Sequence, residues 1–152
     1  MPGVNASPTL DPLAFMRRVG RLYRLLHETI HPDLERALGL QPKEVQVLAA
    51  VADGHHSPTV ISRRVGAPAP STSRFIDQLV TSGLLERHAH PGDLRRFQLR
   101  LTPQGEATLR EARTLARTAL TRRFEAIPPA DLEGAEQSLM VLEGHFNPGE
   151  DL

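Results

Sequence analysis

The stretch that decides the fold covers residues 57–87 and reads SPTVISRRVGAPAPSTSRFIDQLVTSGLLER. Ser57 followed by Pro58 is typical of the start of a helix, because serine caps the free N–H groups and proline suits the first turn. Gly66 permits a sharp turn, and a second helix is expected over residues 69–82, closed by Gly83. Two short helices joined by a glycine turn predict a helix-turn-helix.

The second of these helices has one apolar and one polar side. The polar side, with Arg63 and Arg64 on the preceding helix, supplies the first candidate DNA-binding residues: Pro70, Ser71, Ser73, Arg74 and Gln78. Arginine can donate two hydrogen bonds to guanine, and glutamine can pair with adenine. Arg63 and Arg64 are candidate phosphate contacts. The alternative is an ordinary solvated helix surface.

A β-hairpin is expected directly after the helix-turn-helix. Residues 85–90 and 94–101 are predicted strands, since Phe97, Leu99 and Leu101 alternate with polar residues. The link HPGD over residues 90–93 has the chemistry of a tight turn. A basic hairpin in this place is typical of a wing, and Arg95 and Arg96 at its tip are candidates for the minor groove. Asp93 is expected to orient Arg95; an exposed turn charge paired with Asp93 is the alternative.

Helices are expected on both sides of this unit, so the predicted fold class is mainly α with a small β-hairpin. A first helix starts at Asp11 and should stop at His31-Pro32, with a short helix over residues 33–38 and another opened by Gln41-Pro42. A long helix is expected over residues 103–126 and a last one over 132–146. Tyr23, on the apolar stripe of the first helix, is expected in the core.

Composition bounds the function. The chain has 152 residues and no cysteine, which excludes disulfides, cysteine-ligated zinc and iron–sulfur clusters. It has no apolar run near the roughly 20 residues of a membrane span. The first residues show no basic start or apolar stretch, so no signal peptide is expected and the expected compartment is the cytoplasm. No glycine-rich phosphate loop or nucleophile elbow is present, so no enzyme is expected.

The charges are unevenly distributed along the chain. Basic and acidic residues balance at 18 each, but residues 55–102 carry 7 arginines against 3 acidic residues, whereas residues 103–152 carry 5 against 9. A basic centre predicts a surface that faces a polyanion. It argues against the competing hypothesis of a winged helix that serves as a protein-interaction module without DNA binding.

The order of these elements resembles the MarR (multiple antibiotic resistance regulator) family of winged helix-turn-helix transcription factors. The resemblance rests on residues 57–87, on Asp93 and Arg95 in a D-x-R pattern, and on the junction LTPQG over residues 101–105, which is similar to the family's L-T-x-x-G. It implies a single domain over residues 1–152. Within it, residues 11–38 and 103–146 would form dimerisation helices, and residues 42–102 would form the DNA-binding lobe.

The resemblance also implies double-stranded DNA and a second copy of the chain as partners, and often a repressor released by a small phenolic or anionic effector. No membrane association and no cofactor are expected. The candidate effector-binding residues are Arg17, Arg21, Arg24 and His27, whose alternative is a solvated basic stripe. The seven histidines leave a metal-responsive regulator as a further alternative, although nothing in their spacing brings three ligands together and no metal site is expected.

Overall fold

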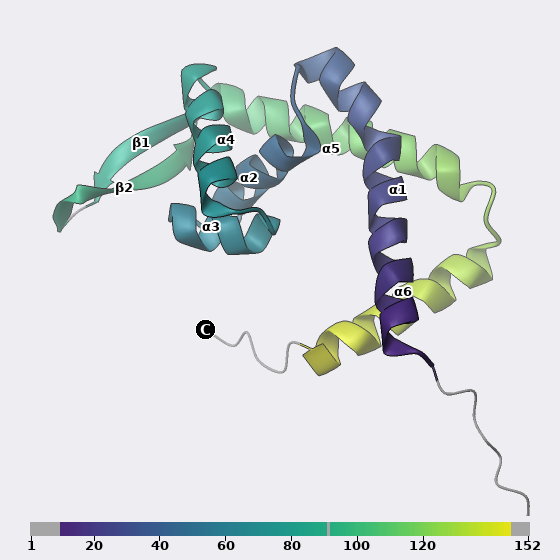
Figure 1. Cartoon of the computed structure of the whole chain (residues 1–152). Coiled ribbons are helices and arrows are strands. Elements are labelled where there is room, and N and C mark those ends of the chain that lie inside the picture. Colours follow the sequence, from purple (N-terminus) through teal and green to yellow (C-terminus); the bar gives the residue numbers. More distant parts are fainter. Residues whose placement is uncertain (1–9, 91, 147–152) are drawn as a thin grey trace, which may run out of the picture.

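The structure of the chain is a computed structural model that describes residues 10–90 and 92–146, without the side chains of residue 90 and residues 93–96. Figure 1 shows a small lobe on one side and long helices on the other. The order of elements is α1 (Pro12–Leu38), α2 (Pro42–Ala52), α3 (Pro58–Val65), α4 (Ala69–Thr81), β1 (Leu85–His90), β2 (Asp93–Leu101), α5 (Pro103–Phe124) and α6 (Pro129–Phe146). The predicted fold class, mainly helical with one antiparallel hairpin, is confirmed.

Helix α1 corrects one prediction. It begins at Asp11, whose side chain accepts a hydrogen bond from the backbone N–H of Leu13, but it does not end at Pro32. It continues through that proline to Leu38 and ends at Gly39, in the left-handed conformation with φ 65°. Proline inside a helix costs roughly 3 kcal/mol, which packing must offset. Leu34, two residues beyond it, is buried, and α1 packs along α5.

The core lies in the lobe. α2, α3 and α4 pack against one another, and both strands close the far side. The largest side chains that they bury completely include Leu48, Ile61, Ile76, Leu79, Leu85 and Leu99. Burying a leucine or isoleucine side chain stabilises a fold by about 1.5–3 kcal/mol, so this cluster is sufficient to fix the lobe as one unit.

The two-stranded sheet has a defined register. Leu85 pairs with Leu101, Arg87 with Leu99 and Ala89 with Phe97, and an irregularity follows Ala89. Because directly opposed residues share a face, these six lie on the face that contains the buried Leu85 and Leu99. Glu86, His88, Gln98 and Arg100 therefore lie on the other face.

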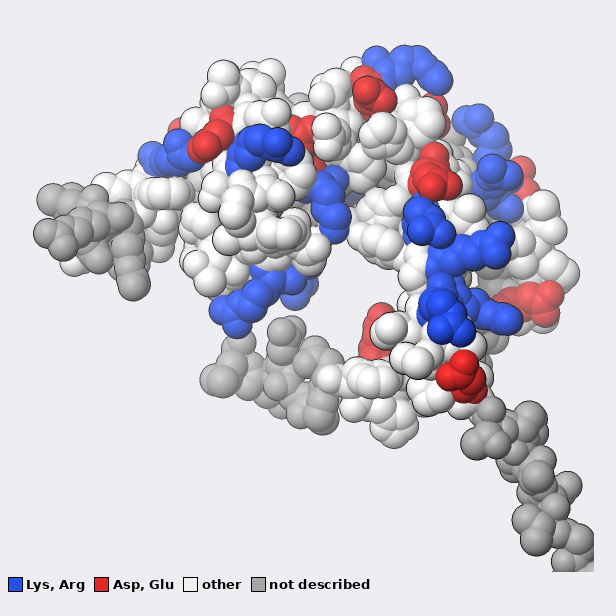
Figure 2. Space-filling model, viewed as in Figure 1, with Lys and Arg blue, Asp and Glu red and all other residues white. Residues whose placement is uncertain are grey.

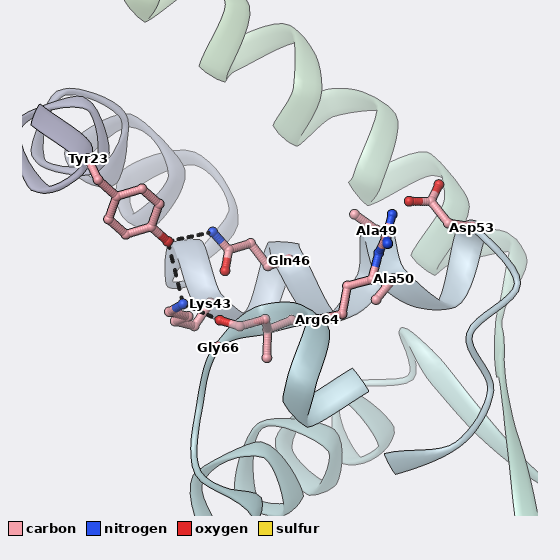
Figure 3. A pocket seen from close by; sticks show the side chains of 9 residues that line it. Tyr23, Lys43, Gln46, Ala49, Ala50, Asp53, Arg64 and Gly66 are labelled. Carbon is pink, nitrogen blue, oxygen red and sulfur yellow. Dashed lines mark hydrogen bonds between the residues drawn. The ribbon is translucent and has the colours of Figure 1, made fainter. Parts of the chain in front are cut away.

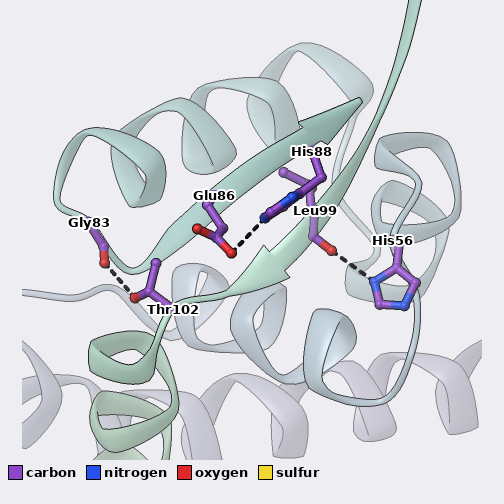
Figure 4. A network of polar contacts seen from close by, with 6 residues as sticks. All are labelled: His56, Gly83, Glu86, His88, Leu99 and Thr102. Carbon is purple, nitrogen blue, oxygen red and sulfur yellow. Dashed lines mark hydrogen bonds and ion pairs between the residues drawn. The ribbon is translucent and has the colours of Figure 1, made fainter. Parts of the chain in front are cut away.

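The junction at residues 101–105 fixes the hairpin to the long helix. Thr102 Oγ1 donates to the carbonyl oxygen of Gly83 at 2.6 Å and accepts from the backbone N–H of Gly105 at 3.0 Å (Figure 4). The backbone N–H of Thr102 donates to the carbonyl oxygen of Leu84 at 3.2 Å. Thr102 thereby caps α5 and holds the start of β1 with one side chain, which is the physical basis of the L-T-x-x-G pattern.

Helix α6 stands apart from the rest of the fold. It has no substantial contact with another helix or strand of the described chain, and none of its residues is buried. Figure 1 shows it leading back from the turn that follows α5, below the lobe and at the same end of the molecule as the start of α1. Four of its large apolar side chains are exposed, namely Leu139, Met140, Val141 and Phe146, whereas Leu132 and Leu142 are half-buried.

Candidate nucleic-acid interface

The turn between α3 and α4 is built as the sequence predicts. Gly66 ends α3 with φ 59°, a conformation that side chains other than glycine rarely adopt. Ser62 Oγ donates to the carbonyl oxygen of Ala67 at 2.7 Å, and Thr72 Oγ1 donates to the same oxygen at 3.4 Å. Two hydroxyl groups, one on each helix, thus fix the angle between α3 and α4.

Helix α4 separates its two sides sharply. Thr72, Phe75, Ile76 and Leu79 are buried in the core, as predicted. The other side is exposed at Pro70, Ser73, Arg74 and Gln78 and half-buried at Ser71. The helix is therefore rigidly seated while it presents a short polar row to solvent, as a helix that reads DNA must.

The structure distinguishes the positions of the predicted residues around α4. Gln78 lies at the edge of a cavity of about 470 Å³ that also touches Leu38 of α1 and Gln104 of α5. Arg63 and Arg64 are exposed in the last turn of α3, and Arg64 lines a different cavity beside α1. The other predicted residues of α3 and α4 line neither of these two cavities: Arg63, Pro70, Ser71, Ser73 and Arg74.

The hairpin is fixed at its base. The backbone N–H of Leu99 donates to the carbonyl oxygen of His56 at 3.1 Å, and His56 Nδ1 lies 2.8 Å from the carbonyl oxygen of Leu99 (Figure 4). A ring nitrogen beside a carbonyl oxygen must carry the proton, so His56 donates through Nδ1. On the outer face, His88 Nε2 lies 2.6 Å from Glu86 Oε1. Sequence reasoning did not predict this role of His56, because its partner is 43 residues away.

The predicted residues at the wing tip, Asp93, Arg95 and Arg96, have side chains outside the described residues. Their backbone belongs to β2. Their role in contacting DNA stays a prediction.

The predicted effector residues on α1 do not gather into one site. Arg17 lies 3.7 Å from Asp11, and Arg21 and Arg24 are exposed. Figure 2 shows that basic side chains collect along α1, well away from the hairpin. A cavity of about 530 Å³ lies instead where α1 faces α2 and the end of α3, and the lining contains none of these arginines (Figure 3). Its polar lining residues are Tyr23, Lys43, Gln46, Asp53 and Arg64.

A chain of polar contacts links α1 to the lobe at this cavity. Lys43 donates to the carbonyl oxygen of Val65 and lies 3.5 Å from the hydroxyl of Tyr23. Gln46 Nε2 lies 3.3 Å from that hydroxyl and 3.3 Å from His27 Nε2. Tyr23 is 49% exposed, so the prediction that it lies in the core is wrong. Its hydroxyl has two polar neighbours, and the side chain therefore lies at the rim of the cavity.

His27 belongs to the same cluster. Its ring packs against Tyr23 with 4.3 Å between centroids. Partial burial, and then the nearby Lys43 ammonium, lower the pKa of His27 below its ordinary value. The neutral ring accepts a hydrogen bond from Gln46, so uncharged His27 fits this network.

The described part of the chain shows neither a metal site nor a membrane span. Within residues 10–90 and 92–146, no three histidine, aspartate or glutamate side chains come together in a way that could hold a metal ion. Over the same residues, no helix combines the length and the apolar character needed to cross a membrane.

Comparison with known proteins shows a family match in the lobe and a shared fold over most of the chain. The model of the MarR family matches residues 38–96, which hold α2, α3, α4, β1 and the first part of β2. The crystal structure of wild-type apo MarR from E. coli superimposes with a TM-score of 0.78, over 88% of this chain and 98% of that one, at 18% identity. Residues 38–96 of this chain therefore match the MarR family, and most of the chain shares the fold of MarR.

Two further solved structures share the MarR fold of this chain. BldR, a transcriptional regulator from Sulfolobus solfataricus, has a TM-score of 0.72 over 84% of this chain and 94% of its own, at 22% identity. CouR from Rhodococcus jostii, solved with p-coumaroyl-CoA bound, has a TM-score of 0.71 over 91% and 94%, at 20% identity. The shared fold thus extends beyond residues 38–96 to the long helices.

A curated relative matches the chain over a shorter range. YsmB of Bacillus subtilis, an uncharacterized HTH-type transcriptional regulator, is 29% identical over 83 residues, or 55% of this chain. The match spans 57% of the length of YsmB. What these MarR-family relatives bind therefore enters below as a proposal for this chain.

Proposed function

We propose that this chain is a sequence-specific, double-stranded DNA-binding transcriptional regulator of the MarR family, and not an enzyme. The observation that carries the proposal is the exposed polar row on α4, whose opposite side is locked into the core beside a hairpin. Such a helix enters the major groove, where base edges carry a distinct pattern of donors and acceptors. A regulator of genes works where the DNA is, so we place it in the cytoplasm.

The proposed contacts follow the geometry of the lobe. Arg74 and Ser73 of α4 contact base edges or nearby phosphates, with Pro70 and Ser71 at the start of the helix and Gln78 at its edge. Arg63 contacts phosphate. Arg95 and Arg96 follow the hairpin to the flanking minor groove, where charge and groove width attract arginine, and Asp93 orients Arg95.

We propose that the protein acts as a homodimer. Large apolar side chains stay exposed on the first half of α1 and on α6, including Met16 at 64% and Met140 at 64%. Monomers rarely expose so many large apolar side chains, and a second copy would cover them. Residues 11–38 and 103–146 then form the dimerisation base, and residues 42–102 the DNA-binding lobe. The two lobes would bind a pseudo-palindrome with half-sites about 10 base pairs apart.

We propose that the cavity between α1 and the lobe binds a small phenolic or anionic effector. A volume of about 530 Å³ suits a small aromatic molecule, and Lys43 and Arg64 against the single carboxylate of Asp53 leave its lining net positive. CouR, with p-coumaroyl-CoA, shows a fold neighbour that holds a phenolic acyl group. A ligand that draws Lys43 from Val65 would loosen the contact between α2 and α3, so binding of effector and DNA would oppose each other. On the resemblance to the family, we propose that the protein acts as a repressor.

Selection of binding sites tests the proposal. The full chain is used to enrich duplexes from a random-sequence pool, and the enriched sequence is compared with a scrambled duplex at several salt concentrations. Enrichment of a pseudo-palindrome that binds about a thousandfold or more above the scrambled duplex is expected. Equal weak binding to both would instead favour a protein-interaction module.

A further inference from the structure

Among the described side chains of the hairpin, Arg87 is an arginine that lies against α4. It lies in β1 opposite Leu99, on the face of the sheet that contains the buried leucines. Its guanidinium forms an ion pair with the carboxylate of Asp77 on α4. The same guanidinium lies 5.0 Å from the ring centroid of Phe97 on β2, within the range of a cation–π contact.

The three residues therefore connect three elements. Asp77 belongs to the helix with the polar row, and Arg87 and Phe97 belong to the two strands that lead to the wing tip. A planar guanidinium that contacts both a carboxylate and an aromatic ring is more restricted than one in a single surface ion pair. We propose that Asp77, Arg87 and Phe97 form a clamp that sets the angle between α4 and the wing, so that Arg87 is a positioning residue for DNA binding and not itself a DNA contact.

The inference rests on the proposed function and makes it more specific. A helix in the major groove and a wing at the minor groove must be spaced to match the DNA. A displacement of about 1 Å at a positioned side chain strongly weakens the interaction that the side chain makes. The clamp also explains an acidic residue on the side of α4 that would face phosphates. Paired with Arg87, Asp77 adds no net charge there.

Charge variants distinguish a clamp from a phosphate contact. The protein used is the full chain, and the probes are the duplex selected above and its scrambled control. The variants are Asp77→Asn, Arg87→Gln and the double variant, with Asp77→Glu as the conservative change and Arg100→Gln, on the outer face of the hairpin, as the matched control. Thermal melting is measured for each, and the comparison is made among variants that melt as wild type does.

The clamp predicts that Asp77→Asn and Arg87→Gln each weaken binding to the selected duplex about three- to tenfold, as expected for an ion pair with a cation–π contact. The double variant is no weaker than the worse single one, Asp77→Glu retains most of the affinity, and the salt slope stays unchanged. The inference is overturned if Arg87→Gln lowers the slope by about 1 per half-site while Asp77→Asn tightens binding. It is also overturned if Arg87→Gln matches Arg100→Gln. Failure of wild type to prefer the selected duplex would instead refute the proposed function.

Discussion

Gly105 lies so close to Leu84 that a Cβ on the glycine would come within 2.0 Å of the leucine carbonyl oxygen. Real Cβ atoms do not approach oxygen so closely, so Gly105→Ala must push the first turn of α5 away from the start of β1. We expect the free energy of unfolding, measured by urea denaturation, to fall by about 1–3 kcal/mol, as for other overpacked sites.

Gly134→Ala is the matched control for this change. A Cβ at Gly134, inside α6, meets nothing within 4 Å in the chain. In a helix interior, alanine is more stable than glycine by roughly 0.8–1 kcal/mol, so this variant should be as stable as wild type or more stable. Equal destabilisation by both substitutions would show that the close approach at Gly105 is not the cause.

A pH dependence is expected from His27. Burial and the nearby Lys43 lower the pKa of His27 in the folded chain, whereas the unfolded chain takes up this proton as the pH falls through about 6.5. The unfolded state then binds more protons, so this part of the stability is present above about pH 6.5 and is lost as the pH falls toward the folded pKa. His27→Gln should lose less stability than wild type between about pH 8 and about pH 5 in urea titrations. Parallel losses in the two proteins would contradict the assignment.

Arg74 is expected to read a base. Arg74→Ala should cost about 1–3 kcal/mol of affinity for the selected duplex and much less for a scrambled one, as measured by mobility shift. Arg113→Ala removes an exposed arginine from α5, outside the helix-turn-helix and the hairpin, and serves as the control. An equal loss on both duplexes would reduce Arg74 to a phosphate contact.

Arg95 is expected to contact the DNA through charge. Arg95→Ala should weaken binding to selected and scrambled duplexes by similar factors and lower the salt slope by about 1 per half-site, since each neutralised phosphate releases about one counterion. Asp93→Ala should reproduce part of the loss by freeing the arginine. Plots of log affinity against log salt that coincide for Arg95→Ala and wild type would place the wing tip away from DNA.

Truncation tests the dimerisation base. A chain that ends at Ala126 lacks α6, which makes little contact within its own subunit but exposes apolar side chains. We expect this variant to lose dimerisation in analytical ultracentrifugation while the lobe keeps its helical signal in circular dichroism. Leu139→Glu, within the exposed stripe of α6, should weaken the dimer in the same assay without shortening the chain. A truncated chain that stays dimeric would contradict the proposed base.

Local rules predicted most of the fold. The pattern of Thr72, Phe75, Ile76 and Leu79 placed the buried side of α4 correctly, because helical spacing and core packing agree there. The predicted end of the first helix at Pro32 was wrong. A proline inside a helix does destabilise it, but the burial of Leu34 and the packing of α1 on α5 outweigh that free energy. That contact joins residues far apart in sequence, so no local pattern shows it.

Fewer of the residues of the candidate sites could be predicted from the sequence. Arg17, Arg21 and Arg24 form a stripe in the sequence, but the cavity lies beside Lys43 and Gln46, which a helix pattern does not single out. The pairing of Asp77 with Arg87 was likewise hidden, because it depends on how the hairpin folds back toward α4. Spacing along one element predicts a shared face, whereas a site between elements depends on their docking.

The central claim is that α4 reads a DNA sequence. The most direct measurement is the affinity of the full chain for the duplex selected from a random pool, relative to a scrambled duplex of equal length and at equal salt. The account predicts a preference of about a thousandfold or more, most of it lost in Arg74→Ala. Equal affinity for the two duplexes, unchanged by Arg74→Ala, would contradict it.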